Sequence, residues 1–102
     1  MLKHSLRVPS LLVEQAYANG QWINADDGAT LAVTNPADGS TIAHVPALHG
    51  AETQRAIAAA EACFATWREV PAAERAKLLE KWYQLIMDNQ DGLALVLTAG
   101  QG

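Results

Sequence analysis

The sequence predicts an α+β fold, in which a small antiparallel β-meander or hairpin is followed by two or three amphipathic helices. Two observations predict this order. Up to about Leu48 the chain is rich in turn formers and β-branched residues, and from Gly50 onward its apolar residues recur at helical spacing. With 102 residues the chain is long enough for at most one small domain. We expect an N-terminal arm over residues 1–15, a β-meander over residues 16–48 and a helical segment over residues 49–102.

The first residues have the composition of a mobile arm. From Met1 to Val13 the chain carries basic residues, serines and leucines without an acidic residue, a composition that transit peptides share. Pro9 would interrupt a helix there, and the apolar run is too short for a secretory signal. We therefore interpret the segment as a mobile arm. The single cysteine, Cys63, fits a reducing compartment, and we expect a cytoplasmic protein.

A hairpin is predicted at the start of the meander. Asn19-Gly20 is the strongest short hairpin signal, because both turn residues can take a positive φ. The turn joins Tyr17-Ala18 to Gln21-Trp22-Ile23.

Two further strands are predicted after this hairpin. Thr30–Thr34 alternates like a half-buried strand. A turn follows over residues 35–39, and a return strand runs from Thr41 to Val45 until Pro46 ends it. We expect all the strands to form one antiparallel meander with a single apolar face.

The second half predicts helices separated by short breaks. Glu52 lies in the first turn of the first helix, where a negative charge favours the helix dipole. Pro71 stops this helix and suits position N1 of the next. Residues 88–92 interrupt the second helix, and a short third helix follows. The apolar stripes are Ala56, Ala60, Cys63, Phe64 and Trp67 on the first helix, Leu78, Leu79, Trp82, Leu85 and Ile86 on the second, and Leu93, Val96 and Leu97 on the third.

Charge and hydropathy exclude two classes of partner. The 7 basic and 11 acidic residues give a net charge of −4 without a basic cluster, so we expect no nucleic-acid partner. No stretch approaches the ~18 consecutive apolar residues of a membrane span, so we expect no membrane partner.

The residues give no strong case for catalysis. Cys63 lies late in a predicted helix on its apolar face, so we interpret it as a small buried hydrophobe. A nucleophilic thiolate would need a base or a helix N-terminus to lower its pKa. His4, His44 and His49 are interpreted as surface or turn residues, because no pair has the i, i+4 spacing of a metal site.

Three other patterns also favour structural interpretations. The charged residues Glu74, Arg75, Lys77, Glu80 and Lys81 are interpreted as solvated helix-face charges. The helical spacing of Phe64, Trp67, Trp82 and Tyr83 favours core packing over a ligand cage. Gly100-Gln101-Gly102 is similar to the opening of a phosphate loop, but a helical segment precedes it instead of a strand.

Several segments, in collinear order, resemble aldehyde dehydrogenases. Tyr17–Trp22 is similar to the Tyr-Ile-Asn-Gly-x-Trp element near the start of these enzymes, and Val33–Gly39 to their Asn-Pro-Ala-x-Gly turn. Residues 73–79 match their Glu-Arg-x-x-x-Leu pattern, and residues 88–94 resemble the segment before their Glu-Gln-Gly-Lys-Pro. The prefix from Leu11 to Tyr17 is similar to the succinate-semialdehyde dehydrogenase branch.

The resemblance implies that the chain is the N-terminal part of an NAD(P)-dependent enzyme, with residues 49–102 at the start of its Rossmann-like cofactor domain. In this family a cysteine thiolate attacks the aldehyde, hydride passes to NAD or NADP, and a glutamate activates the water that hydrolyses the thioester. Those residues lie downstream of the resembling part. We therefore assign no catalytic or cofactor-binding residue here, and we expect this chain alone to bind neither NAD nor NADP. The implied partner is the remainder of the aldehyde dehydrogenase chain or its oligomer.

The resemblance also implies a metal site. Val33 and Thr34 match the place where several family members use backbone groups to ligate a structural monovalent cation. Another ligand in those members is an acidic residue of the Glu-Gln-Gly segment, and Gly100 stands in its place here.

Two functions remain open at this point. One is an N-terminal fragment of an enzyme that oxidises succinate semialdehyde to succinate, inactive when isolated. The other is a non-catalytic structural or interaction module derived from that scaffold. Both predict apolar helix faces that need a partner surface. The nucleotide sequence beyond the codon for Gly102 would discriminate between them.

Overall fold

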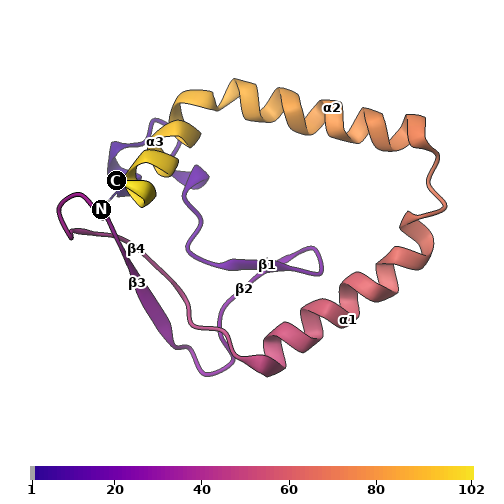
Figure 1. Ribbon diagram of the computed structural model, residues 1–102, viewed down its shortest axis with the longest axis horizontal. Helices are drawn as coiled ribbons and strands as arrows, with labels where there is room; N and C mark the ends of the chain where they lie inside the picture. Colours follow the sequence, from indigo (N-terminus) through magenta and orange to yellow (C-terminus); the bar gives the residue numbers. More distant parts are fainter. Residues whose placement is uncertain (1) are drawn as a thin grey trace.

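The computed structural model describes residues 2–102, and Met1, the first residue of the predicted arm, lies outside the described residues. Figure 1 shows an open arrangement, in which two long helices run around one side of the molecule and a third returns to a pair of strands. The radius of gyration is 16.5 Å, whereas a compact chain of about 100 residues has about 13 Å. The described residues therefore do not collapse around one central core.

The N-terminal segment packs against the strands. It forms two short 3-10 helices, η1 (Leu2–Ser5) and η2 (Pro9–Leu11). Leu2 and Leu6 are buried, and the Glu14 carboxylate accepts a hydrogen bond from the His44 backbone N–H at 2.8 Å. The expectation of a mobile arm is corrected, because the leucines of this segment find apolar partners.

The first predicted hairpin is confirmed. Strands β1 (Ala16–Ala18) and β2 (Gln21–Ile23) pair antiparallel, with Tyr17 opposite Trp22. The φ angles of Asn19 and Gly20 are 50° and 74°, as a two-residue type I′ turn requires. The rings of Tyr17 and Trp22 meet edge to face with centroids 5.0 Å apart.

The second strand pair is confirmed, and it forms a separate sheet. Strands β3 (Thr30–Thr34) and β4 (Thr41–Pro46) pair antiparallel, with the turn over residues 35–39 between them. In this turn Gly39 has a φ of 75°. Within residues 2–102, β2 and β3 do not pair, so the strands form two hairpins and not one continuous meander.

Three helices follow, α1 (Gly50–Trp67), α2 (Ala72–Asp88) and α3 (Gln90–Gln101). Pro71 was predicted at N1 of the second helix. It occupies the N-cap of α2, one position earlier. The break after α2 is confined to Asn89, so the last three residues of the predicted interruption already belong to α3. The observed elements confirm the α+β fold class.

The core lies where α3 meets β3 and β4. Leu2, Ile42 and Ala43 form this cluster, and four partly buried side chains pack against it, namely Leu12, Val33, Val96 and Ala99. Leu97, which was expected on the packed side of α3, is 64% exposed. The helix therefore turns Val96 and Ala99 toward the strands.

The long helices α1 and α2 bury no hydrophobic side chain. Their predicted stripes exist but are uncovered, and the expected core packing of the aromatic residues is corrected. The exposed large side chains are Ile57, Phe64, Trp67, Leu78, Leu79, Trp82, Tyr83, Leu85, Ile86 and Met87. Among the described residues, no helix combines the length and the apolar character needed to span a membrane.

Candidate functional site

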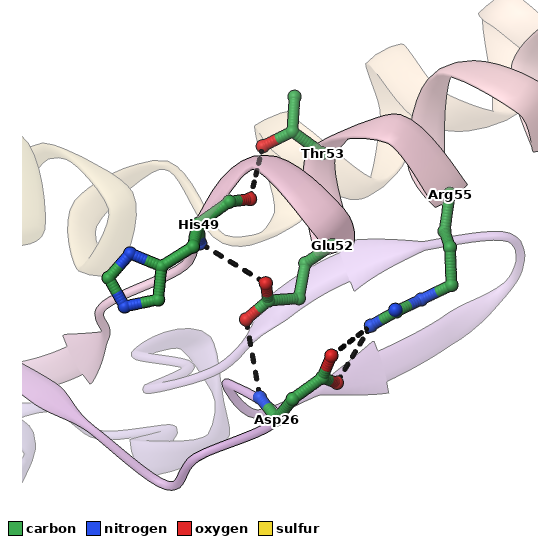
Figure 2. Close-up of polar contacts among 5 residues, drawn as sticks. All are labelled: Asp26, His49, Glu52, Thr53 and Arg55. Atoms are coloured by element: carbon green, nitrogen blue, oxygen red, sulfur yellow. Dashed lines mark hydrogen bonds and ion pairs between the residues drawn. The ribbon is translucent and has the colours of Figure 1, made fainter.

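The densest polar cluster joins the start of α1 to the loop between β2 and β3 (Figure 2). Glu52, in the first turn of α1, is only 4% exposed. Its Oε1 accepts a hydrogen bond from the His49 backbone N–H at 3.3 Å, and its Oε2 accepts one from the Asp26 backbone N–H at 3.2 Å. The Thr53 hydroxyl donates to the His49 carbonyl at 3.0 Å. These bonds fix the N-terminus of α1 on the loop.

An ion pair reinforces this cluster at the surface. Arg55 Nη2 donates to both carboxylate oxygens of Asp26 at 2.7 Å. The hydrogen bond and the charge of Asp26 raise the pKa of Arg55. Backbone amides, first that of Glu52 itself and then that of Asp26, lower the pKa of the Glu52 carboxyl. The Glu52 carboxyl is therefore favoured in its ionised form, as an acceptor for these amides.

The cluster is suited to structure and not to proton transfer. Both oxygens of Glu52 accept backbone hydrogen bonds and the residue is buried, whereas a general base must be within reach of a substrate proton. Only the place of Glu52 in the first helical turn is visible in the sequence. Its bond to Asp26 crosses 26 positions, and no local pattern predicts a contact of that separation.

Cys63 lies on the surface of α1, so its predicted burial is wrong. The reason is that too little of the described chain packs on α1 to bury its apolar side chains, and Glu52 is the only residue of this helix that is buried. Cys63 is far from the N-terminus of its helix at Gly50, so the helix dipole does not activate it. The Thr66 hydroxyl bonds to the carbonyl of Cys63, and not to its sulfur, at 3.0 Å.

The three histidines lie apart in the fold. His4 is in η1, His44 is exposed on β4, and His49 occupies the N-cap of α1 with its Nε2 3.5 Å from Asp27 Oδ2. In residues 2–102 no group of three or more His, Cys, Asp or Glu residues is arranged to hold a metal ion.

Val33 and Thr34 lie at the end of β3, opposite Ala43 and Thr41, with a register irregularity between them. The C-terminus of α3 lies close to the following turn, since a Cβ on Gly102 would be 3.3 Å from the Cβ of Pro36. The cation site at Val33 and Thr34 stays a prediction. Gly100 has no carboxylate, so the proposal of a monovalent cation on the Val33 and Thr34 backbone lacks its acidic ligand in this chain.

The Gly100–Gly102 stretch ends a helix instead of opening one. Gly100 and Gln101 belong to the last turn of α3, and Gly102 is its C-cap with a φ of 83°. A dinucleotide fingerprint needs a strand before the glycines and a helix N-terminus after them. This stretch therefore does not fit a dinucleotide.

Comparison with known proteins assigns the chain to a family. Residues 22–102 match the model of the aldehyde dehydrogenase family. The chain belongs to the aldehyde dehydrogenase family. The collinear motifs noted in the sequence are thus confirmed as a family resemblance, and the two hairpins and three helices match the N-terminal part of aldehyde dehydrogenase structures.

Three relatives show how much of the family chain is represented. This aldehyde dehydrogenase chain is 50% identical over 97 residues to the 3-sulfolactaldehyde dehydrogenase of Pseudomonas putida. The matched residues cover 95% of this chain and 20% of that protein. It is 42% identical over 93 residues to the NADP(+) succinate-semialdehyde dehydrogenase of Escherichia coli K12, covering 91% of the chain and 19% of that protein. The crystal structure of succinate-semialdehyde dehydrogenase from Burkholderia pseudomallei superposes with a TM-score of 0.89 at 48% identity, covering 93% of this chain and 20% of that one. The chain spans about a fifth of the length of these relatives.

Proposed function

We propose that residues 1–102 are the N-terminal framework of an NAD(P)-dependent aldehyde dehydrogenase, with residues 49–102 at the start of its cofactor domain. The observation that carries the proposal is the pairing of a TM-score of 0.89 over 93% of this chain with coverage of only 20% of the matched enzyme. The exposed apolar faces of α1 and α2 support it, because they await the rest of a larger protein. Bond-making groups and the oligomer interface then belong to other parts of that protein, which we place in the cytoplasm.

For the complete enzyme we propose the oxidation of succinate semialdehyde to succinate. Two of the relatives are named for succinate semialdehyde, and the 50% identical one is named for 3-sulfolactaldehyde. Both aldehydes carry a terminal anionic group, a carboxylate in one and a sulfonate in the other. An anionic aldehyde is therefore the proposed substrate class, and 3-sulfolactaldehyde is the second candidate.

The substrate is tested on the whole gene. The nucleotide sequence past the codon for Gly102 is determined, the complete reading frame is expressed, and NAD(P)H formation is followed with each aldehyde and each cofactor. We expect the higher kcat/KM with succinate semialdehyde. A preference for 3-sulfolactaldehyde would select the second candidate, and a frame without a Gly-Gln-x-Cys element would contradict an active enzyme.

The framework role is tested on a fusion. Residues 1–102 are joined to the part of the Pseudomonas putida relative that they do not match, which is the remaining four-fifths of that protein. We expect this fusion to fold and to oxidise the substrate of the relative, whereas residues 1–102 alone produce no NAD(P)H. An insoluble or inactive fusion, or turnover by the isolated chain, would contradict the proposal.

A further inference from the structure

An apolar groove of about 560 Å³ lies between the end of α1 and the first half of α2. Trp67 of α1 and Trp82 of α2 line it together with Leu78 and Leu79, and the two indoles are 43% and 63% exposed. Side chains of this size cover several hundred Å² of apolar surface, and a protein rarely leaves such a patch in water.

The groove also contains a charged group, and one donor atom of this group has no partner within residues 2–102. Arg75 is half-buried, and its Nε is shielded from solvent with no hydrogen-bond acceptor anywhere in residues 2–102. A guanidinium stays charged at all physiological pH values, and a buried charged donor is costly unless an acceptor reaches it. The interpretation of Arg75 as a solvated surface charge is therefore corrected. Arg68, by contrast, is exposed and lies 3.6 Å from Glu69.

We propose that this groove is the docking site for a segment of the same polypeptide, drawn from the four-fifths of the family chain that residues 1–102 do not match. The segment places an apolar side chain between Trp67 and Trp82 and a carboxylate on the Arg75 guanidinium, the only charged group among the residues that line the groove. A carboxylate fits because it neutralises the guanidinium and forms the stronger, charge-assisted hydrogen bond. This inference rests on the proposed framework role.

A second copy of the chain is a poor occupant of the groove. A two-fold dimer brings the same patch of both copies together, so each Arg75 would face only groove residues of the other copy. The residues that line the groove include no Asp or Glu that could separate the two charges. A segment from elsewhere in the protein can supply the missing acid.

The test uses the fusion described above with Arg75→Met, Arg75→Lys and the matched control Arg68→Met. We expect Arg75→Met to lower the Tm by about 5 °C or more, since it leaves a carboxylate buried without its partner. Arg75→Lys recovers part of the loss, and Arg68→Met shifts the Tm by about 1 °C at most, as is usual for exposed ion pairs. An active fusion in which Arg75→Met behaves like Arg68→Met would overturn the docking site and leave the framework role intact, whereas a fusion that does not fold contradicts the framework role itself.

The identity of the acceptor is read from the pH dependence. If the partner is a carboxylate, the difference in Tm between the fusion and its Arg75→Met variant shrinks as the pH falls from 7 to 4, because the acid becomes protonated. A difference that stays constant over this range would point to a backbone carbonyl and would overturn the carboxylate.

The second-copy alternative is tested on the isolated chain with Trp22→Phe, which leaves Trp67 and Trp82 as the only tryptophans. We expect Arg75→Met to leave the acrylamide quenching of the two indoles unchanged at every protein concentration. A discrete dimer that protects the indoles and that Arg75→Met dissociates would overturn the intramolecular assignment.

Discussion

The Glu52 carboxylate accepts a hydrogen bond from the backbone N–H of Asp26, and this bond ties the first turn of α1 to a loop that lies 26 positions earlier. Glu52→Gln keeps the shape of the side chain but removes the charge and one acceptor. We expect it to lower the thermal midpoint of the helical signal at 222 nm by about 2–5 °C. The matched control is Glu61→Gln, an exposed position on α1, which should leave the midpoint unchanged. Equal midpoints for both variants would show that the hydrogen bond between Glu52 and Asp26 contributes nothing to thermal stability.

The same carboxylate makes stability depend on pH. The pKa of Glu52 lies below its ordinary value of 4.5, because backbone amides of Glu52, Asp26 and His49 stabilise the ionised form. A hydrogen bond from the His44 backbone likewise lowers the pKa of Glu14 from 4.5. The unfolded chain therefore takes up protons first as the pH falls. We expect these carboxylates to contribute fully to the free energy of unfolding above pH 4.5 and progressively less below it. In Glu52→Gln, stability should fall less steeply as the pH is lowered. Destabilisation that sets in well above pH 5 would have another origin.

The turn between β3 and β4 depends on a left-handed glycine. Gly39 has a φ of 75°, a conformation that costs a residue with a Cβ about 1–2 kcal/mol. We expect Gly39→Ala to destabilise the chain by about 1 kcal/mol in urea titrations. Gly50→Ala is the control, because Gly50 lies in the first turn of α1 with open space around its Cβ position. A neutral Gly39→Ala would mean that the turn adopts another geometry.

A second glycine allows η2 to approach α3. A Cβ on Gly92 would lie 2.6 Å from Leu11 Cδ1, so Gly92→Val pushes the Leu11 side chain out of its place against α3 and weakens the packing of the N-terminal segment. We expect faster tryptic cleavage after Lys3 and Arg7 in this variant. Gly100→Val, at a site on α3 with nothing within 4 Å of the added Cβ, should leave the cleavage rate unchanged. Equal rates in the two variants would contradict the packing of this segment.

The uncovered helix faces predict self-association of the isolated chain. Leu79 and Trp82 on α2 are 60% and 63% exposed, and surfaces of this kind associate in water. Sedimentation velocity should show concentration-dependent, polydisperse species, and Leu79→Lys should reduce them while Lys77→Arg does not. A monodisperse wild-type monomer with a sharp cooperative melt would be the contrary result.

Local signals in the sequence predicted most of the elements. Asn19-Gly20 placed the first hairpin, because few residues other than Asn and Gly tolerate positive φ at both turn positions. The spacing of apolar residues placed α1 and α2, and Pro71 placed the boundary between them. The break before α3 was predicted over residues 88–92, but α3 already begins at Gln90 and includes Gly92. The missing side chain of Gly92 makes room for Leu11.

Side-chain environments were harder to predict, because periodicity gives the apolar face of a helix but not whether anything covers it. Cys63, Trp67 and Trp82 were expected in a core and lie at the surface. The role of Glu52 depends on Asp26, which is distant in the sequence. The role proposed for Arg75 depends on an acceptor that residues 2–102 do not supply. No spacing rule within the chain could have shown them.

The α1–α2 segment is held at both of its ends, by Glu52 at the start of α1 and by α3 after Asn89 (Figure 1). Because both ends of this segment are fixed, its rigid-body motion relative to the strands is restricted. In the framework role proposed above, these helices lose little orientational entropy when the remaining protein packs on them. The proposed framework is thus preformed, and how tightly the remaining protein binds to it would depend mainly on the surface that this remaining protein supplies.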